Sequence, residues 1–67
     1  MNVNDTKILV HLRKQIKEDY DDNARFLTSG MAKSFDEYRH VCGVIRGLTQ
    51  ADSLINDLVQ RLEHDDD

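Results

Sequence analysis

The spacing of apolar residues between positions 38 and 62 restricts this chain more than any other feature of its sequence. An apolar side chain recurs there every three or four residues, and Asp52 is the one polar member of the series. The members are Tyr38, Val41, Ile45, Leu48, Asp52, Ile55, Val59 and Leu62. Because steps of three and four residues place side chains on one side of an α-helix, the series predicts a long helix with a heptad seam.

A second apolar series runs beside the first along the same segment. It consists of His40, Val44, Gly47, Ala51, Leu54 and Leu58. Two adjacent series form an apolar face that is too wide for one partner helix to cover. Upstream, Ser34 and Glu37 have the spacing of a capping box, in which the serine oxygen accepts a hydrogen bond from the amide three residues later. We therefore expect a helix over about residues 35–63 and an acidic tail at 64–67.

The first part of the chain predicts another helix, over about residues 5–29. Asn4 or Asp5 can act as its N-cap, and Gly30 stands where the end of a helix favours a positive φ. Its expected inward series is Leu9, Leu12, Ile16, Tyr20, Asn23 and Leu27, widened by Ile8 and Phe26. On its outer side, the opposite charges expected to pair four residues apart are Lys14–Glu18, Lys17–Asp21 and Asp21–Arg25.

Residues 30–34 connect the two predicted helices, and so short a connection makes the helices antiparallel neighbours. The chain has 67 residues, which we interpret as a single module over residues 1–67. A chain of this size buries only about 60% of its unfolded surface and is marginally stable alone. The sequence therefore predicts an all-α antiparallel two-helix hairpin that is oligomeric or docked on a larger assembly.

Two glycines, Gly43 and Gly47, lie one turn apart inside the second predicted helix, and Ala51 lies another turn on. A glycine within a helix costs about 1 kcal/mol relative to alanine, so the pair needs a physical reason. The apolar series continues in phase through both glycines, which argues against a turn, and a phosphate loop needs a different glycine spacing. Small side chains allow a second backbone to approach closely, so we interpret the stripe as a helix contact. The alternative is a locally weakened or kinked helix.

Charge and composition argue against several classes of protein. The formal net charge of −4 argues against direct binding of a nucleic-acid backbone. No apolar run approaches the roughly 20 residues that cross a membrane, and the polar first residues do not resemble a signal peptide. The single cysteine, Cys42, has no internal disulfide partner, and we expect it to be a small buried hydrophobe in a cytosol-like compartment.

The three histidines do not form the core of a recognisable active site. His11, His40 and His64 are far apart in the sequence. His40 and Cys42 are two residues apart and point to different sides of a helix, so they do not hold one zinc ion as a pair. We predict no catalytic residues, no enzyme activity, no metal and no cofactor.

A set of residues in the second predicted helix carries a family resemblance. They are Phe35-x-x-Tyr38-Arg39, Gly43-x-Ile45-x-Gly47-Leu48, Ala51 and Ile55-x-Asp57-Leu58. Through them, residues 35–62 resemble small helical proteins encoded among the head and portal genes of short-tailed bacteriophages. The resemblance implies a non-enzymatic structural or assembly protein, found in the host cytoplasm during assembly and in the virion. The alternative is a small phage-encoded inhibitor or regulator that binds a host protein.

We expect contact with other proteins to be made by the apolar face of the second helix. The predicted interface residues are Tyr38, Val41, Gly43, Val44, Ile45, Gly47, Leu48, Ala51, Leu54, Ile55, Leu58, Val59 and Leu62. The expected partners are the chain itself, a larger phage structural protein, or both, because large exposed apolar patches usually mark interfaces. Neither a nucleic acid nor a membrane is an expected partner.

Residues 19–30 begin like a calcium-binding loop, and this similarity leads to a test. Calcium loops require glycine at the sixth position and glutamate at the twelfth, where this chain has Ala24 and Gly30. We therefore expect the melting temperature to be the same in calcium and in a chelator. A shift of several degrees in thermal melts followed by circular dichroism would contradict this interpretation.

Overall fold

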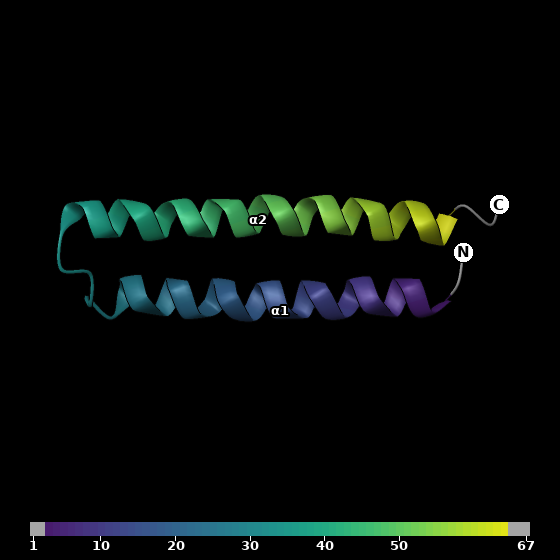
Figure 1. Cartoon of the computed structure of the whole chain (residues 1–67), viewed down its shortest axis with the longest axis horizontal. Coiled ribbons are helices and arrows are strands. Elements are labelled where there is room, and N and C mark those ends of the chain that lie inside the picture. Colours follow the sequence, from purple (N-terminus) through teal and green to yellow (C-terminus); the bar gives the residue numbers. More distant parts are fainter. Residues whose placement is uncertain (1–2, 65–67) are drawn as a thin grey trace.

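The computed structural model describes residues 3–64 and consists of two long α-helices joined by a short turn (Figure 1). Helix α1 spans Val3–Thr28 and helix α2 spans Phe35–His64. The helices lie side by side and antiparallel, so the start of α1 and the end of α2 lie at the same end of the rod (Figure 1). The predicted all-α hairpin is confirmed for this part of the chain.

The observed helix bounds agree with the predicted bounds to within two residues. Helix α1 begins at Val3 and ends at Thr28, where residues 5–29 were expected. Helix α2 includes His64, which the sequence had placed in the acidic tail. The rest of the predicted tail, residues 65–67, lies outside the described residues.

The turn is held by the two devices that the sequence predicts. Gly30 adopts a φ of 75°, the left-handed conformation that suits a residue directly after a helix. Its amide donates a hydrogen bond of 3.3 Å to the carbonyl of Leu27. At the start of α2, the amide of Glu37 donates a 3.1 Å hydrogen bond to Oγ of Ser34. Because this bond satisfies one free amide of the first turn, Ser34 is the N-cap of α2.

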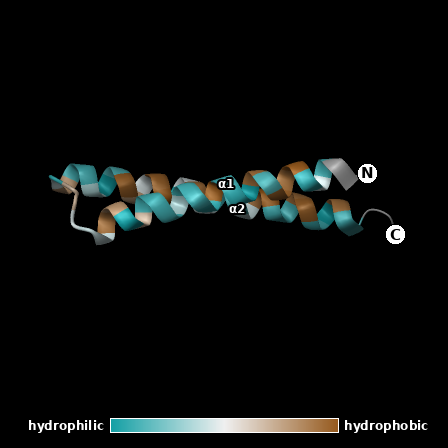
Figure 2. Ribbon diagram, turned by 90° about the horizontal axis from the view of Figure 1, so that it is seen from below, coloured by the Kyte–Doolittle hydropathy of each residue, from teal (hydrophilic) through white to brown (hydrophobic). Residues whose placement is uncertain are grey.

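The first apolar series of α2 faces α1. Val41 and Val59 are the two buried apolar side chains among residues 5–64, at 8% and 6% exposed. The other members, Ile45, Leu48, Asp52, Ile55 and Leu62, are half-buried. Tyr38 is the exception at 46% exposed, because it lies in the first turn of α2, where the seam ends beside the connection. Apolar positions recur along both ribbons in Figure 2.

The inward side of α1 differs from the prediction at one position. Leu12 is 41% exposed, and Arg13 takes the inward place that was assigned to it. With Arg13 included, the residues on this side of α1 follow strict steps of three and four: Thr6, Leu9, Arg13, Ile16, Tyr20, Asn23 and Leu27. All are half-buried except Tyr20, which is 39% exposed. The predicted inward position of Leu12 was wrong, because it was based on the hydrophobicity of the residue and not on the phase of the helix.

The predicted ion pairs along α1 are not formed among the described residues. Instead, Arg25 contacts Asp22 at 2.6 Å, three residues away, with both side chains well exposed. Nδ2 of the Asn23 side chain donates a 2.8 Å hydrogen bond to the backbone carbonyl of Asp19. Exposed pairs of long side chains gain little Coulomb energy and lose rotamer freedom, so the spacing of charges alone does not fix them.

The hairpin is a thin rod with little interior. The backbone extends over 51 × 15 × 12 Å, and its radius of gyration is 15.4 Å, against about 11 Å for a compact domain of this length. The accessible surface is 5371 Å², whereas about 4,400 Å² is typical of a compact monomer of this size. Much of the apolar surface of the chain therefore lies outside the contact between its helices.

The buried position of Val59 gives a direct test of the seam. Replacing Val59 by alanine removes two methyl groups from the contact with α1, which should lower the free energy of unfolding by about 1.5 kcal/mol. Gln60→Ala, a change at an exposed position in the same turn, serves as the matched control. Equal stabilities of the two variants in denaturant titrations would show that this seam does not hold the hairpin together.

Candidate functional site

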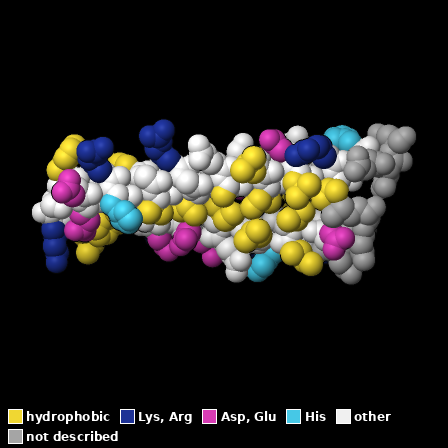
Figure 3. Space-filling model, turned by 45° about the horizontal axis from the view of Figure 1, so that its top comes forward, with side chains coloured by type: hydrophobic (Ala, Val, Ile, Leu, Met, Phe, Trp, Pro, Cys, Tyr) yellow, Lys and Arg dark blue, Asp and Glu magenta, His cyan; other side chains and the backbone are white. Residues whose placement is uncertain are grey.

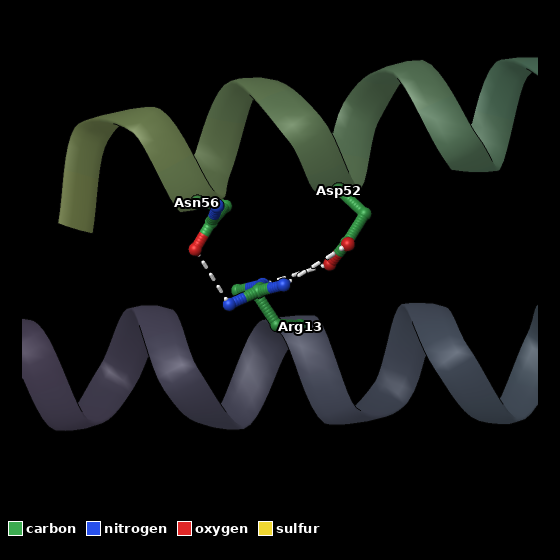
Figure 4. A network of polar contacts seen from close by, with 3 residues as sticks. All are labelled: Arg13, Asp52 and Asn56. Carbon is green, nitrogen blue, oxygen red and sulfur yellow. Dashed lines mark hydrogen bonds and ion pairs between the residues drawn. The ribbon is translucent and has the colours of Figure 1, made fainter. Parts of the chain in front are cut away.

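A polar cluster interrupts the apolar seam near its middle (Figure 4). Nε and Nη2 of Arg13 donate hydrogen bonds to the two carboxylate oxygens of Asp52, at 2.8 and 3.1 Å. Nη1 of the same guanidinium donates to Oδ1 of Asn56 at 2.9 Å. One arginine of α1 is thus held by two residues of α2 that lie one turn apart, which fixes both its position and its orientation.

The cluster is half-exposed, with side-chain exposures of 35% for Arg13 and 37% for Asp52. The hydrogen bonds from Arg13 lower the pKa of the Asp52 carboxyl, and the same bonds raise the pKa of the guanidinium. Sliding the helices by one heptad would place Arg13 opposite Ile45 or Val59 and leave its charge without a partner. The cluster therefore favours the observed register of the two helices over registers shifted by one heptad.

The largest exposed apolar side chains on one side of the rod gather toward the end where α1 begins and α2 ends. We define the leucine face as Ile8, Leu12, Leu54 and Leu58, which are 65%, 41%, 69% and 39% exposed. A shallow cavity of about 330 Å³ lies between the helices here and is lined by Ile8 and Leu58, among others. Figure 3 shows this side, with hydrophobic side chains in a continuous band over both helices and acidic side chains along one edge.

The two helical glycines are not explained by the hairpin itself. A methyl group built on Gly43 or Gly47 would meet no heavy atom of the described residues within 4 Å, apart from its own local backbone. Helix α1 is therefore not the close partner that the glycine stripe indicates. The α-helix continues through both positions. Gly47 precedes Ala51 and Leu54 on the side of the leucine face, so the open space lies over a surface that is free for another molecule.

The structure divides the predicted interface residues into two groups. Those that face α1 and form the hairpin are Val41, Ile45, Leu48, Ile55, Val59 and Leu62, all buried or half-buried. Those outside this contact are Tyr38, Gly43, Val44, Gly47, Ala51, Leu54 and Leu58, which are half-buried or exposed. The second group, together with Ile8 and Leu12 of α1, is the surface that a partner protein can reach.

A groove runs along the opposite side of the seam. We define the lysine groove by its apolar floor, Val10, Ile16, Tyr20 and Leu48, and by its rim, Lys14 and Lys17. Thr49 and the paired Arg13 and Asp52 also line it. Its volume is about 520 Å³. Val10 is 52% exposed, so the floor is apolar and open to solvent. Within residues 3–64, neither rim lysine takes part in an ion pair within 4 Å.

The aromatic residues near the turn form a small separate cluster. The rings of Phe35 and Tyr38 stack with their centroids 6.3 Å apart. The guanidinium of Arg39 lies 5.9 Å from the centroid of the Phe35 ring, within reach of a cation–π contact. Phe35 is 71% exposed and Met31 is 62% exposed, so this end of the rod also presents apolar surface.

The remaining candidate residues are scattered over the surface. Cys42 is half-buried rather than buried, because it lies at the edge of the seam and not at its centre. His11, His40 and His64 are exposed and lie at separate places along the rod. Among residues 3–64, no group of three or more histidine, cysteine or acidic side chains has the arrangement of a metal site. Residues 19–28, where a calcium loop was considered, belong to α1.

Three features of the site were missed by sequence reasoning. They are the inward place of Arg13, the part played by Asn56, and the lysine groove. The strict heptad phase of α2, carried across to α1, would have identified Arg13 as the residue nearest to Asp52. An acid inside an apolar seam also requires a cation or a polar partner, which is a signal in its own right.

Comparison of the chain with family models, with curated proteins and with solved structures found no match. Neither helix of the described region contains an apolar stretch of the length needed to cross a membrane.

The lowered pKa of Asp52 predicts how stability changes in acid. The Asp52 carboxylate stabilises the fold fully above its unfolded pKa of about 4, and this contribution is lost as pH falls through the lower folded pKa. Wild type should therefore lose more melting temperature between pH 6 and 2 than Asp52→Asn. The control is Asp57→Asn, at an exposed position outside the cluster. Equal acid sensitivity of wild type and Asp52→Asn would contradict the pairing with Arg13.

Proposed function

We propose that this chain is a non-enzymatic contact protein that acts through the exposed apolar surface of its hairpin. The observation that carries the proposal is the continuous leucine face, in which both helices expose large apolar side chains to solvent (Figure 3). A monomeric protein rarely keeps such a patch uncovered unless another molecule binds there. The thinness of the rod supports the same conclusion, because a partner would bury apolar surface that the hairpin leaves exposed.

The open space over Gly47 supports close packing against a partner helix. Glycine at this position costs helix stability, and no atom of the hairpin uses the space that it leaves. A partner backbone could approach α2 along Gly47 and Ala51 while its side chains cover Leu54. The contact surface would then be a helix-binding surface rather than a site for a small ligand.

The biological setting of the proposal comes from the resemblance of residues 35–62 to small phage head and portal proteins. In that setting the chain would be a structural or assembly component of a bacteriophage particle. It would be present in the host cytoplasm during assembly and afterwards in the virion. Its partners would be a larger structural protein, further copies of itself, or both.

The Gly47→Leu variant tests partner contact separately from folding, because it should reduce binding to a partner without destabilising the hairpin. Leucine raises helix propensity by nearly 1 kcal/mol relative to glycine, and a Cβ atom at Gly47 has open space within 4 Å among the described residues. The variant should therefore melt at the same temperature as wild type or higher at low protein concentration. Its incorporation into phage particles, measured by quantitative mass spectrometry of purified particles, should fall at least tenfold because the leucine blocks the approach of a partner.

Ser53→Leu is the matched control, because it adds a leucine at an exposed position of α2 away from the leucine face. It should be incorporated at the wild-type copy number. Normal incorporation of Gly47→Leu would refute the proposed contact surface. Absence of the wild-type chain from particles would refute the structural role and favour the binding of a host protein.

A further inference from the structure

The two long sides of the hairpin differ in charge as well as in shape. By their helical phase, Asp5, Asp19, Asp22 and Glu37 lie on the side of the leucine face, with Arg61 as a basic residue on that side. Beside the lysine groove the charges are reversed. By their heptad positions, Lys7, Lys14, Lys17, Arg39 and Arg46 lie on that side, together with Asp21 and Glu63. The formal net charge of −4 hides this separation of charge across the rod.

This separation decides how two copies can pair. If the leucine faces of two copies met, their acidic borders would also meet, and like charges at an interface oppose binding. If two lysine grooves met, Lys14 and Lys17 would face the same residues of the other copy. Only the leucine face of one copy against the lysine groove of the next brings opposite charges together. That pairing also places the exposed leucines on the apolar floor formed by Val10, Ile16 and Leu48.

We propose that the lysine groove is the binding site for the leucine face of a second copy of this chain. The inference rests on the proposed function, because it names a partner for the same contact surface. The interface is heterologous, so each copy keeps one free surface of each kind after the first contact. Copies therefore add one after another, and the assembly grows beyond a dimer into a ring or a filament.

The size of the rod suits such a contact. One side of the backbone, 51 Å long and 15 Å wide, covers a rectangle of about 770 Å². A standard protein interface buries roughly 800 Å² of accessible surface on each partner, so the contact would occupy most of one side of the rod. Both surfaces are accessible without any change of the backbone, because Leu54 is 69% exposed and Val10 is 52% exposed in the single hairpin.

A mixing experiment with two one-sided variants tests the inference. Leu54→Lys damages the leucine face, and the double variant Lys14→Glu with Lys17→Glu damages the lysine groove. Each variant alone should be a helical monomer by sedimentation velocity and circular dichroism, whereas wild type forms species larger than dimers. An equimolar mixture should form a 1:1 complex, because one intact surface of each kind remains in the pair. Gln50→Lys and Lys33→Glu, at exposed positions outside both surfaces, should associate like wild type.

Several outcomes would overturn the inference. Self-association of the groove variant alone would show that leucine faces pair with each other. A mixture that stays monomeric while wild type associates would show that the two surfaces do not bind. Gly47→Leu should give the same mixing result as Leu54→Lys, so that a folding defect of one variant does not decide the outcome.

The proposed function is judged separately from this inference. A wild-type chain that stays monomeric up to millimolar concentration, yet is found in particles, would refute the pairing of copies and leave the contact function standing. A chain that forms the 1:1 mixed complex but is absent from particles would refute the structural role in the virion and support the pairing of copies.

Discussion

Two helices share only one seam, and this geometric constraint governs the rest of the structure. Each helix of the hairpin can turn about one third of its surface toward its neighbour. The apolar pattern of α2 covers more than that, because a second series runs beside the inward one. The hairpin therefore buries Val41 and Val59, half-buries most of the remaining seam, and leaves Leu54 exposed. The apolar residues of α2 that α1 does not cover form the surface to which the proposed contacts are assigned.

A single polar cluster gives this thin seam its specificity. Apolar side chains at heptad positions attract one another in several registers, and a rod with few buried residues has little shape complementarity to select among them. The hydrogen bonds from the Arg13 guanidinium to Asp52 and Asn56 add a directional, charged interaction to the contact between the helices. Half-exposed ion pairs contribute little to net stability, so the value of this one lies in opposing the wrong alignments.

The sequence predicted the helices, the turn and the inward series of α2 because each has a local physical cause. Ser34 caps a helix, Gly30 ends one, and steps of three and four residues define a side. It did not predict that Arg13 replaces Leu12 in the seam, since this depends on the phase of one helix relative to the other. The groove beside Lys14 and Lys17 was also missed, because it exists only once two helices lie together.

The claim to be tested is that further copies of this chain cover the surface that the hairpin leaves exposed, so that its stability is coupled to self-association. The most direct test is the melting temperature of the wild-type chain measured as a function of its own concentration. If copies bind one another in the folded state, the melting temperature rises steadily with concentration, because association draws the chain out of the unfolded state. A melting temperature that is high and independent of concentration from micromolar to millimolar would contradict the claim.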